Sequence, residues 1–252
     1  MRISLYWLRE YVEADLPLSQ LVEKLNMIGL LVEDWKEADG DIILDIETYA
    51  NRPDTLGHLG VAREVAAVLN VPLKKKAWPI TEREEESSKL VEIQIKDADL
   101  CPRYCGIIVK NIPVGPSPEW LRKRVEAMGL KSVSNVVDVT NYVLFSTAHP
   151  IHAFDLEKIS GNKIIVRKAE KGETLKSLEG KDIFLSPEML VIADEEKPVA
   201  LAGVIGGEES GVTEKTHHVF IESAYFDPLS IRKTSKETGI VTEASYRFER
   251  GA

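Results

Sequence analysis

The sequence predicts an α+β protein in which a small helix-containing domain, residues 1–85, precedes a larger mixed α/β domain, residues 86–252. Helix signals are concentrated in the first part, whereas strand-like runs outnumber helices after residue 90. Between the two parts, the charged and serine-containing segment Thr81–Ser88 is typical of a domain linker. A chain of 252 residues is long enough for one large domain or two modest ones.

Helix punctuation identifies four helices in chain order. They are predicted at residues 18–29, 58–70, 117–129 and 227–239. Ser117 and Asp227 are predicted as N-caps because each precedes a proline at the first helical position. Gly129 and Gly239 are expected to end their helices in the left-handed conformation.

Alternating or β-branched apolar runs predict six strands. They are Val91–Ile95, Tyr104–Val109, Lys163–Arg167, Leu190–Ala193, Val199–Val204 and Val219–Glu222. The run Asn135–Tyr142, followed by Pro150–Asp155, is interpreted as an apolar strand with polar side chains beside it. The polar side chains are Thr140, Asn141, Tyr142, His152 and Asp155. A buried hydroxyl or amide without a partner costs roughly 1–3 kcal/mol, so this concentration of polar groups indicates a binding pocket.

Composition excludes a membrane-spanning or secreted protein. Apolar residues make up 44% of the chain and charged residues 29%, as in a globular protein. The longest apolar runs, such as Met27–Val32, are far shorter than the roughly 18 residues that span a bilayer. Charge at Arg9 and Glu10 interrupts the N-terminal apolar stretch too early for a secretory signal, so a cytoplasmic location is expected.

The sequence indicates no metal site. Cys101 and Cys105 form a C-x3-C pair without a histidine at ligand spacing, so we expect two reduced, half-buried thiols. His217 and His218 are adjacent, and adjacent residues of a strand point to opposite faces, so we interpret them as strand or turn residues.

The charge of the chain does not by itself predict a nucleic-acid partner. A net charge of −9 opposes contact with phosphates. Basic clusters occur at residues 74–76, at 122–124 with Lys131, and at 232–233 with Lys236, whereas residues 82–86 are predominantly acidic. Each cluster is by itself typical of a solvated surface.

Five motifs together resemble one protein family. They are Asn51–Asp54, Leu59–Glu64, Ala200–Glu209, Val219–Pro228 and Thr242–Gly251. In one colinear order from Ile3 to Gly251, the chain resembles the N-terminal half of the bacterial phenylalanyl-tRNA synthetase beta subunit, including its B3/B4 editing domain. The resemblance implies a B1-like domain at residues 1–85 and a B3/B4-like domain at residues 86–252, truncated at its C-terminus.

The chain departs from the family pattern in three places. Only about Glu33–Asp41 joins the first helix to the Asn51–Asp54 motif, too few residues for the family's oligonucleotide-binding-fold insert, which is therefore expected to be absent. The chain stops just after Gly251, as expected of a fragment, an engineered deletion or a natural minimal form. Ala148 and His149 stand where the family usually has Gly-Gln, which adds a second imidazole near His152.

The resemblance implies an editing site that hydrolyses tyrosine wrongly esterified to phenylalanine tRNA. A pocket shaped for phenylalanine rejects an added hydroxyl by only about 10²-fold, so a second site that recognises the hydroxyl is needed. Matched family positions make Glu222 the acceptor of the phenol and place the Gly203 N–H beside it, with Ala202, Thr242 and Ala244 in the pocket wall. On spacing alone, Glu222 is equally compatible with a strand-end carboxylate that faces water.

The same resemblance matches His152, Thr140 and Asn141 to catalytic positions that hold polar atoms of the substrate and orient the attacking water. Such a reaction needs no metal or cofactor, and ATP and Mg²⁺ are expected only in the complete synthetase. The implied partners are the aminoacylated 3′ end of tRNA(Phe) and the synthetase alpha subunit, without a membrane. No aminoacylation is expected from this chain alone, because it lacks a phosphate-binding G-x-x-x-x-G-K loop.

Two other functions stay open. The domain could be a non-catalytic scaffold that binds tRNA or the partner subunit. The glycines at positions 203, 206 and 207 could form a dinucleotide loop, although they lack the G-x-G-x-x-G spacing. Glu208 and Glu209 follow them and would repel a phosphate.

Overall fold

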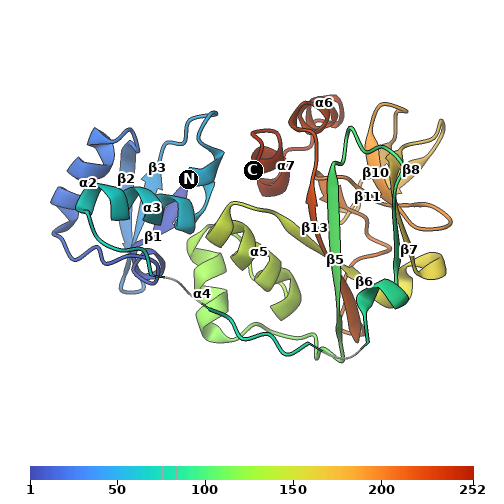
Figure 1. Ribbon diagram of the computed structural model, residues 1–252, viewed down its shortest axis with the longest axis horizontal. Helices are drawn as coiled ribbons and strands as arrows, with labels where there is room; N and C mark the ends of the chain where they lie inside the picture. The colour runs from blue at the N-terminus through green and yellow to red at the C-terminus, as the bar shows by residue number, and fades with distance from the viewer. Residues whose placement is uncertain (75–76, 83–84) are drawn as a thin grey trace.

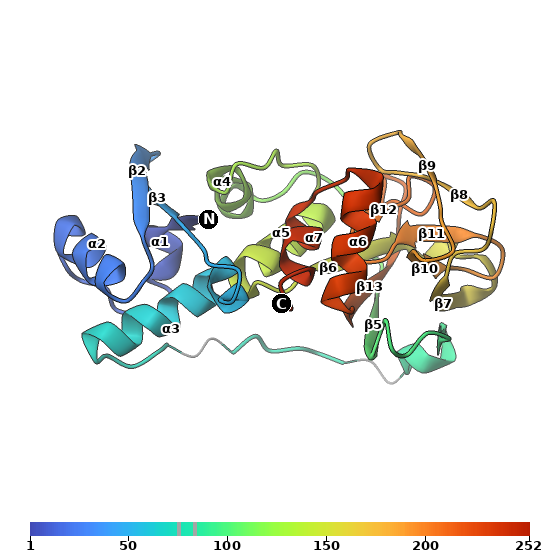
Figure 2. The same ribbon diagram turned by 90° about the horizontal axis from the view of Figure 1, so that it is seen from above.

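The computed structural model describes residues 1–74, 77–82 and 85–252, and it confirms the α+β class (Figure 1). The predicted linker Thr81–Ser88 and the basic run at residues 74–76 lie partly outside the described residues. A short 3-10 turn, η2 (Ser87–Lys89), leads into the second part of the chain. Figure 2 shows that α3 and β5 lie toward opposite ends of the molecule.

The N-terminal part is a three-stranded antiparallel sheet with helices packed against it. The strand order is β1 (Arg2–Ser4), β3 (Asp41–Ile46), β2 (Val32–Ala38). The helices are α1 (Leu5–Leu8), α2 (Leu18–Met27), the 3-10 turn η1 (Pro53–Leu56) and α3 (His58–Leu69). Strands β2 and β3 form a hairpin whose turn residues, Asp39 and Gly40, have φ values of 51° and 78°. The segment Glu33–Asp41 is therefore a hairpin, too short to contain an inserted domain.

The second part is built on two sheets that share one core. A five-stranded sheet has the order β12 (Ile205–Gly206), β11 (Pro198–Leu201), β10 (Leu190–Ala193), β7 (Lys163–Lys168), β4 (Glu92–Ile95). A three-stranded antiparallel sheet has the order β5 (Arg103–Lys110), β13 (His218–Tyr225), β6 (Ile151–Asp155). Phe154 and Phe220 of the second sheet pack in one cluster with Val166 and Ile192 of the first.

The remaining elements complete this part of the fold. They are α4 (Glu119–Ala127), α5 (Asn135–Thr147), the 3-10 turns η3 (Leu156–Lys158) and η4 (Ser160–Asn162), the hairpin β8 (Thr174–Lys176) and β9 (Asp182–Phe184), α6 (Pro228–Thr238) and α7 (Glu243–Phe248).

Most predicted elements are confirmed. Asp227 caps α6 by accepting a hydrogen bond from the Ser230 N–H at 2.7 Å, and Gly239 ends that helix at a φ of 69°. The six predicted strands are present, Leu190–Ala193 with the predicted ends and the others with ends shifted by at most three residues. β11 ends three residues early, at Leu201, because the chain turns at Gly203, where φ is 65°, and β13 continues three residues beyond Glu222, to Tyr225.

Two local predictions are wrong. Asn135–Tyr142 is part of helix α5, not an apolar strand. The Ser134 hydroxyl accepts from the Val137 N–H and caps this helix, which overrides the strand preference of its valines. Ser117 is not the N-cap of α4, because its hydroxyl donates to Asp138 at 2.5 Å and Pro118 occupies the cap position.

Helices α4 and α5 lie between the two parts of the fold (Figure 1). Met128, just after α4, and Leu144 and Phe145 of α5 belong to the same hydrophobic cluster as the N-terminal residues Trp7 and Val61. The core of the N-terminal part is therefore completed by residues that come after the predicted linker in the sequence. Each part depends on the other for the burial of these side chains.

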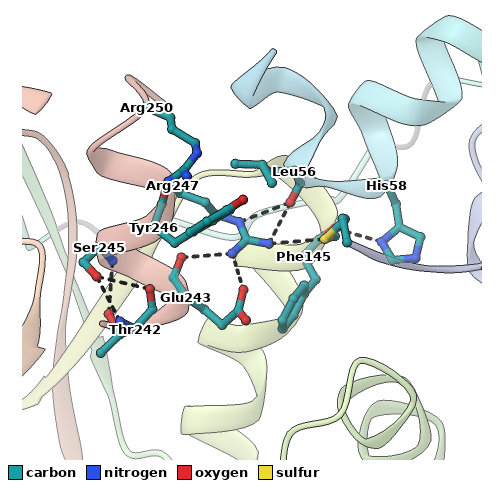
Figure 3. Close-up of polar contacts among 10 residues, drawn as sticks. Leu56, His58, Phe145, Thr242, Glu243, Ser245, Tyr246, Arg247 and Arg250 are labelled. Carbon is teal, nitrogen blue, oxygen red and sulfur yellow. Dashed lines mark hydrogen bonds and ion pairs between the residues drawn. The ribbon is translucent and has the colours of Figure 1, made fainter. Parts of the chain in front are cut away.

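A buried arginine joins helix α7 to the turn η1 of the N-terminal part (Figure 3). Arg247 of α7 is fully buried, and its Nε and Nη2 donate to the carbonyl oxygen of Leu56 at 3.1 and 2.8 Å. Its Nη1 donates to the carbonyl oxygen of Glu243 at 2.9 Å and pairs with the Glu243 carboxylate at 2.5 Å. The guanidinium also lies over the Phe145 ring, 5.0 Å from its centroid. These contacts fix α7 against both η1 and α5.

We expect Arg247→Met to lower the free energy of unfolding by about 3 kcal/mol, because the Leu56 carbonyl would be buried without a donor and an ion pair would be broken. Urea denaturation of both proteins measures the difference. Arg232→Met is the matched control, since Arg232 is exposed on the adjacent helix α6, and its effect should stay within about 0.5 kcal/mol. Equal effects of the two substitutions would contradict a role of Arg247 in joining the two parts.

Candidate functional site

Glu222 lies on the central strand of the three-stranded sheet. It pairs with Gly106 of β5 on one side and with His152 of β6 on the other. Directly paired residues of antiparallel strands point to the same face of a sheet. The side chains of Glu222 and His152 therefore share the face that carries the core residues Phe220 and Phe154.

The Glu222 carboxylate is buried and has a neutral partner. The Tyr104 hydroxyl donates to Glu222 Oε2 at 2.6 Å, and both side chains are 7% exposed. Among the described residues, no cation pairs with Glu222 and no group donates to its Oε1. Burial raises the pKa of Glu222 to about 7, and the hydrogen bond from Tyr104 opposes this rise. The site is thus a carboxylate with one oxygen available as an acceptor inside an apolar wall.

His152 contributes an imidazole nitrogen without a partner. The residue as a whole is half-buried, but its Nε2 is covered and makes no hydrogen bond within the described part of the chain. The ring meets Phe154 edge-on, with centroids 4.5 Å apart, and lies directly against Gly206. A Cβ at Gly206 would come within 2.7 Å of Nε2, so only glycine leaves room for this ring. Burial lowers the pKa of His152 to about 4, which keeps the imidazole neutral at pH 7.

A second group of predicted residues gathers where β11 approaches α7. The Thr242 hydroxyl donates to the Val204 carbonyl oxygen at 2.8 Å and also caps α7 by accepting from the Ser245 N–H at 3.0 Å (Figure 3). Ala244 is half-buried against the core, and Ala202 is fully buried. Thr242 thereby ties the start of α7 to the turn that contains Gly203.

The backbone conformation and the packing at position 203 favour glycine. Its φ of 65° is left-handed, and an added Cβ would lie 2.9–3.0 Å from side-chain atoms of Ile231, Phe226 and Phe248. No hydrogen bond of its N–H is found in the described residues, so this group is available as a donor. The described contacts do not join Gly203 or Thr242 directly to Glu222, and the two groups share only the surrounding core.

Thr140 and Asn141 lie on a different element from the other predicted site residues. Helix α5, which carries them, packs through Val136 against Ala153 and Val219, on the sheet face opposite to Glu222. The Thr140 hydroxyl donates to the Val137 carbonyl oxygen at 2.7 Å, within its own helix. Within the described residues, no hydrogen bond joins Thr140 or Asn141 to the Glu222 face. Their catalytic roles stay predictions.

Two other polar side chains of the same motif have structural partners. Tyr142 stacks on Trp7 with ring centroids 4.8 Å apart, facing the N-terminal part. Asp155 accepts from the Thr216 hydroxyl at 2.6 Å and from the Glu157 N–H at 3.2 Å. These side chains stabilise the fold and are not available to a ligand at Glu222.

The second imidazole, His149, lies apart from His152. Its Nε2 is 3.1 Å from the Ser223 hydroxyl, and its ring meets Phe248 edge-on. Ser223 follows Glu222 on β13 and so points to the opposite face of the sheet. Burial lowers the pKa of His149 as well. His149 therefore contacts the back of the strand and the helix that carries Ala244.

Sequence reasoning missed Tyr104, the residue that contacts Glu222. Tyr104 is separated from Glu222 by 118 positions and reaches it only because β5 pairs with β13, with Tyr104 opposite Ala224. The signal available in the sequence was the alternation of Tyr104 and Gly106 on one face of a predicted strand. Without the pairing register, that alternation does not identify the partner strand.

The structure offers no metal cluster within the described residues. Cys101 and Cys105 are both free, but Cys101 is buried and Cys105 is exposed, so the expectation of two half-buried thiols is wrong in detail. Burial raises the pKa of Cys101 to about 12. His218 is a strand residue whose Nδ1 accepts from the Asn111 N–H at 3.1 Å.

None of the helices in the described ranges is both long and apolar enough to cross a bilayer.

Comparison with known proteins identifies the family of this second part. The sequence profile of the B3/4 domain matches residues 100–252, which include Tyr104, His152, Glu222 and α7. The chain belongs to the B3/4 domain family. The matched residues contain both sheets that enclose the common core, apart from strand β4.

The relatives of this chain confirm its resemblance to the phenylalanyl-tRNA synthetase beta subunit. The phenylalanine–tRNA ligase beta subunit of Fusobacterium nucleatum is 48% identical over 211 residues, which cover 84% of this chain and 26% of the relative. That of Anaeromyxobacter dehalogenans is 45% identical over 212 residues, with the same coverage. The Rhodopirellula baltica beta subunit is 40% identical over 253 residues, which cover 99% of this chain and 37% of the relative.

The alignments cover only part of each relative. This chain spans about a quarter to a little over a third of the curated relatives that it matches. The alignment with the Rhodopirellula baltica protein is only one position longer than this chain of 252 residues, so that relative has no large insertion in this span. The short β2–β3 hairpin is therefore compatible with a beta-subunit sequence.

A solved structure supports the fold. The N-terminal fragment of the phenylalanyl-tRNA synthetase beta subunit from Pyrococcus horikoshii aligns with a TM-score of 0.50 at 17% identity. The alignment covers 95% of this chain and 74% of that fragment. At this identity the similarity concerns the arrangement of helices and strands alone.

The raised pKa of Glu222 predicts a stability that falls with increasing pH. In the unfolded chain a glutamate loses its proton near pH 4.5, whereas the folded protein holds the Glu222 proton up to about pH 7. Between these values the unfolded state binds fewer protons, so the free energy of unfolding decreases as the pH rises. A glutamine at position 222 cannot titrate. The free energy of unfolding of Glu222→Gln should therefore rise by about 1–3 kcal/mol relative to that of the wild type when the pH increases from 5 to 8.

Urea denaturation at both pH values measures this gain. Glu237→Gln on α6 is the matched control, because the Glu237 side chain is exposed and stays in water in both states. If the difference in the free energy of unfolding between Glu222→Gln and the wild type were as independent of pH as that of the control, the pKa of Glu222 would not be raised in the folded protein.

Proposed function

We propose that this chain carries the editing site of a phenylalanyl-tRNA synthetase beta subunit and hydrolyses the ester of tyrosine mischarged on tRNA(Phe). The observation that supports the proposal is the buried Glu222 carboxylate in the B3/4 domain, with Oε1 free of a described donor. A buried acceptor of this kind selects a ligand that supplies a hydroxyl over the isostere that lacks one. Tyrosine and phenylalanine differ only by that hydroxyl.

The Gly203 N–H would act as the second group that recognises the phenol. It is available as a donor and has no side chain that would block a ring, while Ala202, Thr242 and Ala244 would form the wall around the aromatic group. A phenol oxygen can donate to Glu222 and accept from this N–H at the same time. One hydroxyl would then satisfy both groups, which a phenylalanine ring cannot do.

His152, Thr140 and Asn141 would serve the ester. A neutral imidazole with a free nitrogen can accept a proton from water, and burial keeps His152 neutral at pH 7. The role of Thr140 and Asn141 in holding polar atoms of the aminoacyl group rests on the family resemblance alone, because α5 packs on the sheet face opposite to Glu222. An aminoacyl ester is already activated, so the step depends on positioning and on stabilisation of the oxyanion. This hydrolysis requires no metal or cofactor.

In the complete enzyme this editing site would work with a separate synthetic site. Aminoacylation, with its ATP and Mg²⁺, would belong to the assembly with the alpha subunit, and the aminoacylated 3′ end of tRNA(Phe) would reach Glu222 after synthesis. A cytoplasmic location follows from this role. The chain spans only part of its relatives, so these partners are tested with the whole beta subunit as well as with this chain.

Deacylation of Tyr-tRNA(Phe) and Phe-tRNA(Phe) tests the proposal directly. Release of tyrosine at a rate well above that of phenylalanine is the expected outcome. Binding of either tRNA without hydrolysis would instead indicate a non-catalytic scaffold. Absence of hydrolysis by both this chain and the whole beta subunit would contradict the proposed function.

We expect Glu222→Ala to reduce kcat/KM for the tyrosine ester by roughly 10- to 150-fold, the value of one hydrogen bond to a charged group, and to leave the phenylalanine ester nearly unchanged. The ratio of the two deacylation rates measures the loss of selectivity. Glu237→Ala on α6 is the control for a general effect of removing a carboxylate. Equal losses for both esters would show that Glu222 does not recognise the hydroxyl.

Ala244→Trp should abolish hydrolysis of the tyrosine ester while the fold persists, because an indole would occupy the volume that the phenol needs. Deacylation and thermal denaturation are measured on the same preparation. Full activity in a folded variant would remove Ala244 from the pocket wall. A large fall in the melting temperature would instead indicate that Ala244 is a core residue that tolerates no larger side chain.

A further inference from the structure

Glu222 is the hydrogen-bond partner of the Tyr104 hydroxyl in the described part of the chain. Its ring stacks on Phe220, with centroids 6.5 Å apart and planes at 12°. The side chain is buried, and its backbone is fixed by the pairing of β5 with β13. The hydroxyl donates to Glu222 Oε2 at 2.6 Å. Two strands and an aromatic stack therefore determine the direction of this hydrogen bond.

The bond makes the two oxygens of Glu222 inequivalent. A phenol hydroxyl has one proton to donate, so Tyr104 holds Oε2 and leaves Oε1 to other donors. No described residue donates to Oε1. Without the Tyr104 hydroxyl, the carboxyl group could rotate about its terminal torsion, which is a soft degree of freedom. The hydroxyl thus fixes the plane in which Oε1 accepts.

We propose that Tyr104 is a positioning residue that determines the specificity of this site: by occupying Oε2 of Glu222, its hydroxyl directs Oε1 at the phenol of a tyrosyl ester. The inference rests on the proposed editing function and adds a residue to it. Two phenols would then share one carboxylate, one belonging to the protein and the other to the substrate.

The surroundings of Glu222 support this arrangement. The titratable groups near the carboxylate are Tyr104 and Cys101 from the β5 side and His152 from β6, and all are neutral at pH 7 because burial raises the pKa of the first two and lowers that of His152. The ionised form of Glu222 therefore depends on hydroxyl donors for stabilisation. The hydrogen bond from Tyr104 lowers the pKa of Glu222 against the effect of burial. A second hydroxyl from the substrate would act in the same direction.

Tyr104→Phe tests the inference because it removes the hydroxyl and keeps the ring that stacks on Phe220. We expect the ratio of tyrosine-ester to phenylalanine-ester hydrolysis to fall by about 3- to 10-fold, the range of a single hydrogen bond, with the phenylalanine ester unchanged. The pH profile for the tyrosine ester should also move to higher pH, because the Glu222 carboxyl loses a donor that favours ionisation. Tyr225→Phe, the same change at the exposed end of β13, is the matched control and should alter neither quantity.

A double-mutant cycle identifies the route of the effect. In a Glu222→Ala background, Tyr104→Phe should change the selectivity by less than about two-fold, because the group that it positions is absent. An undiminished effect in that background, or an unchanged ratio in Tyr104→Phe alone, would overturn the inference.

One measurement separates this inference from the proposed function. The fall of the free energy of unfolding between pH 5 and pH 8 should be steeper in Tyr104→Phe than in the wild type and in Tyr225→Phe, since the folded pKa of Glu222 rises without the hydrogen bond. This readout needs no catalysis. Identical pH dependence in all three proteins would overturn the role of Tyr104, whereas a wild type that fails to release tyrosine while the pH effect is present would overturn the editing function alone.

Discussion

The pairing register of β13 is the constraint on which the candidate site depends. This strand pairs with β5 over its whole length and with β6 over five residues, from Val219 to Ser223. The register brings Tyr104, Glu222 and His152, which are distant in sequence, to one face of the sheet. A slip of one residue would turn Glu222 to the opposite face and bury Ser223 or Ile221 in its place. The proposed specificity and the fold would therefore depend on the same set of backbone hydrogen bonds.

Local sequence signals were sufficient to predict the elements that are bounded by glycine, proline or an N-cap residue. Helix α6 lies between Asp227 and Gly239, as predicted. An N-cap and a left-handed C-terminal glycine each contact only the adjacent turn of the helix, so both can be recognised from local sequence. Helix α5 was predicted wrongly because its valines favour a strand, whereas its packing between the two parts of the fold favours a helix. Ala148, which ends α5 at a φ of 66°, lacks the glycine signal that would have identified the helix end. Tertiary packing, which no local pattern contains, decided the conformation of this segment.

The sequence identified some site residues and not the contacts between them. Glu222 was recognisable as an acidic residue at the end of an apolar run, and the structure buries it. Its partner Tyr104 required the register of β5 on β13, and the position of His152 against Gly206 required the approach of β12 to β6. Thr140 and Asn141 were matched by motif, but α5 carries them on the other side of the sheet from Glu222. Motifs identify residue types, whereas the topology determines which of them meet.

The proposed substrate would account for a carboxylate at position 222. A buried carboxylate without a cation is costly, and a purely structural partner for the Tyr104 hydroxyl could be a glutamine, whose amide oxygen accepts equally well without a charge. A glutamine that accepts from Tyr104 would, however, present its NH₂ group on the other side. A carboxylate presents an acceptor on both sides. A carboxylate is therefore favoured where a second hydroxyl donates to the same side chain, as the phenol of the proposed tyrosyl ester would.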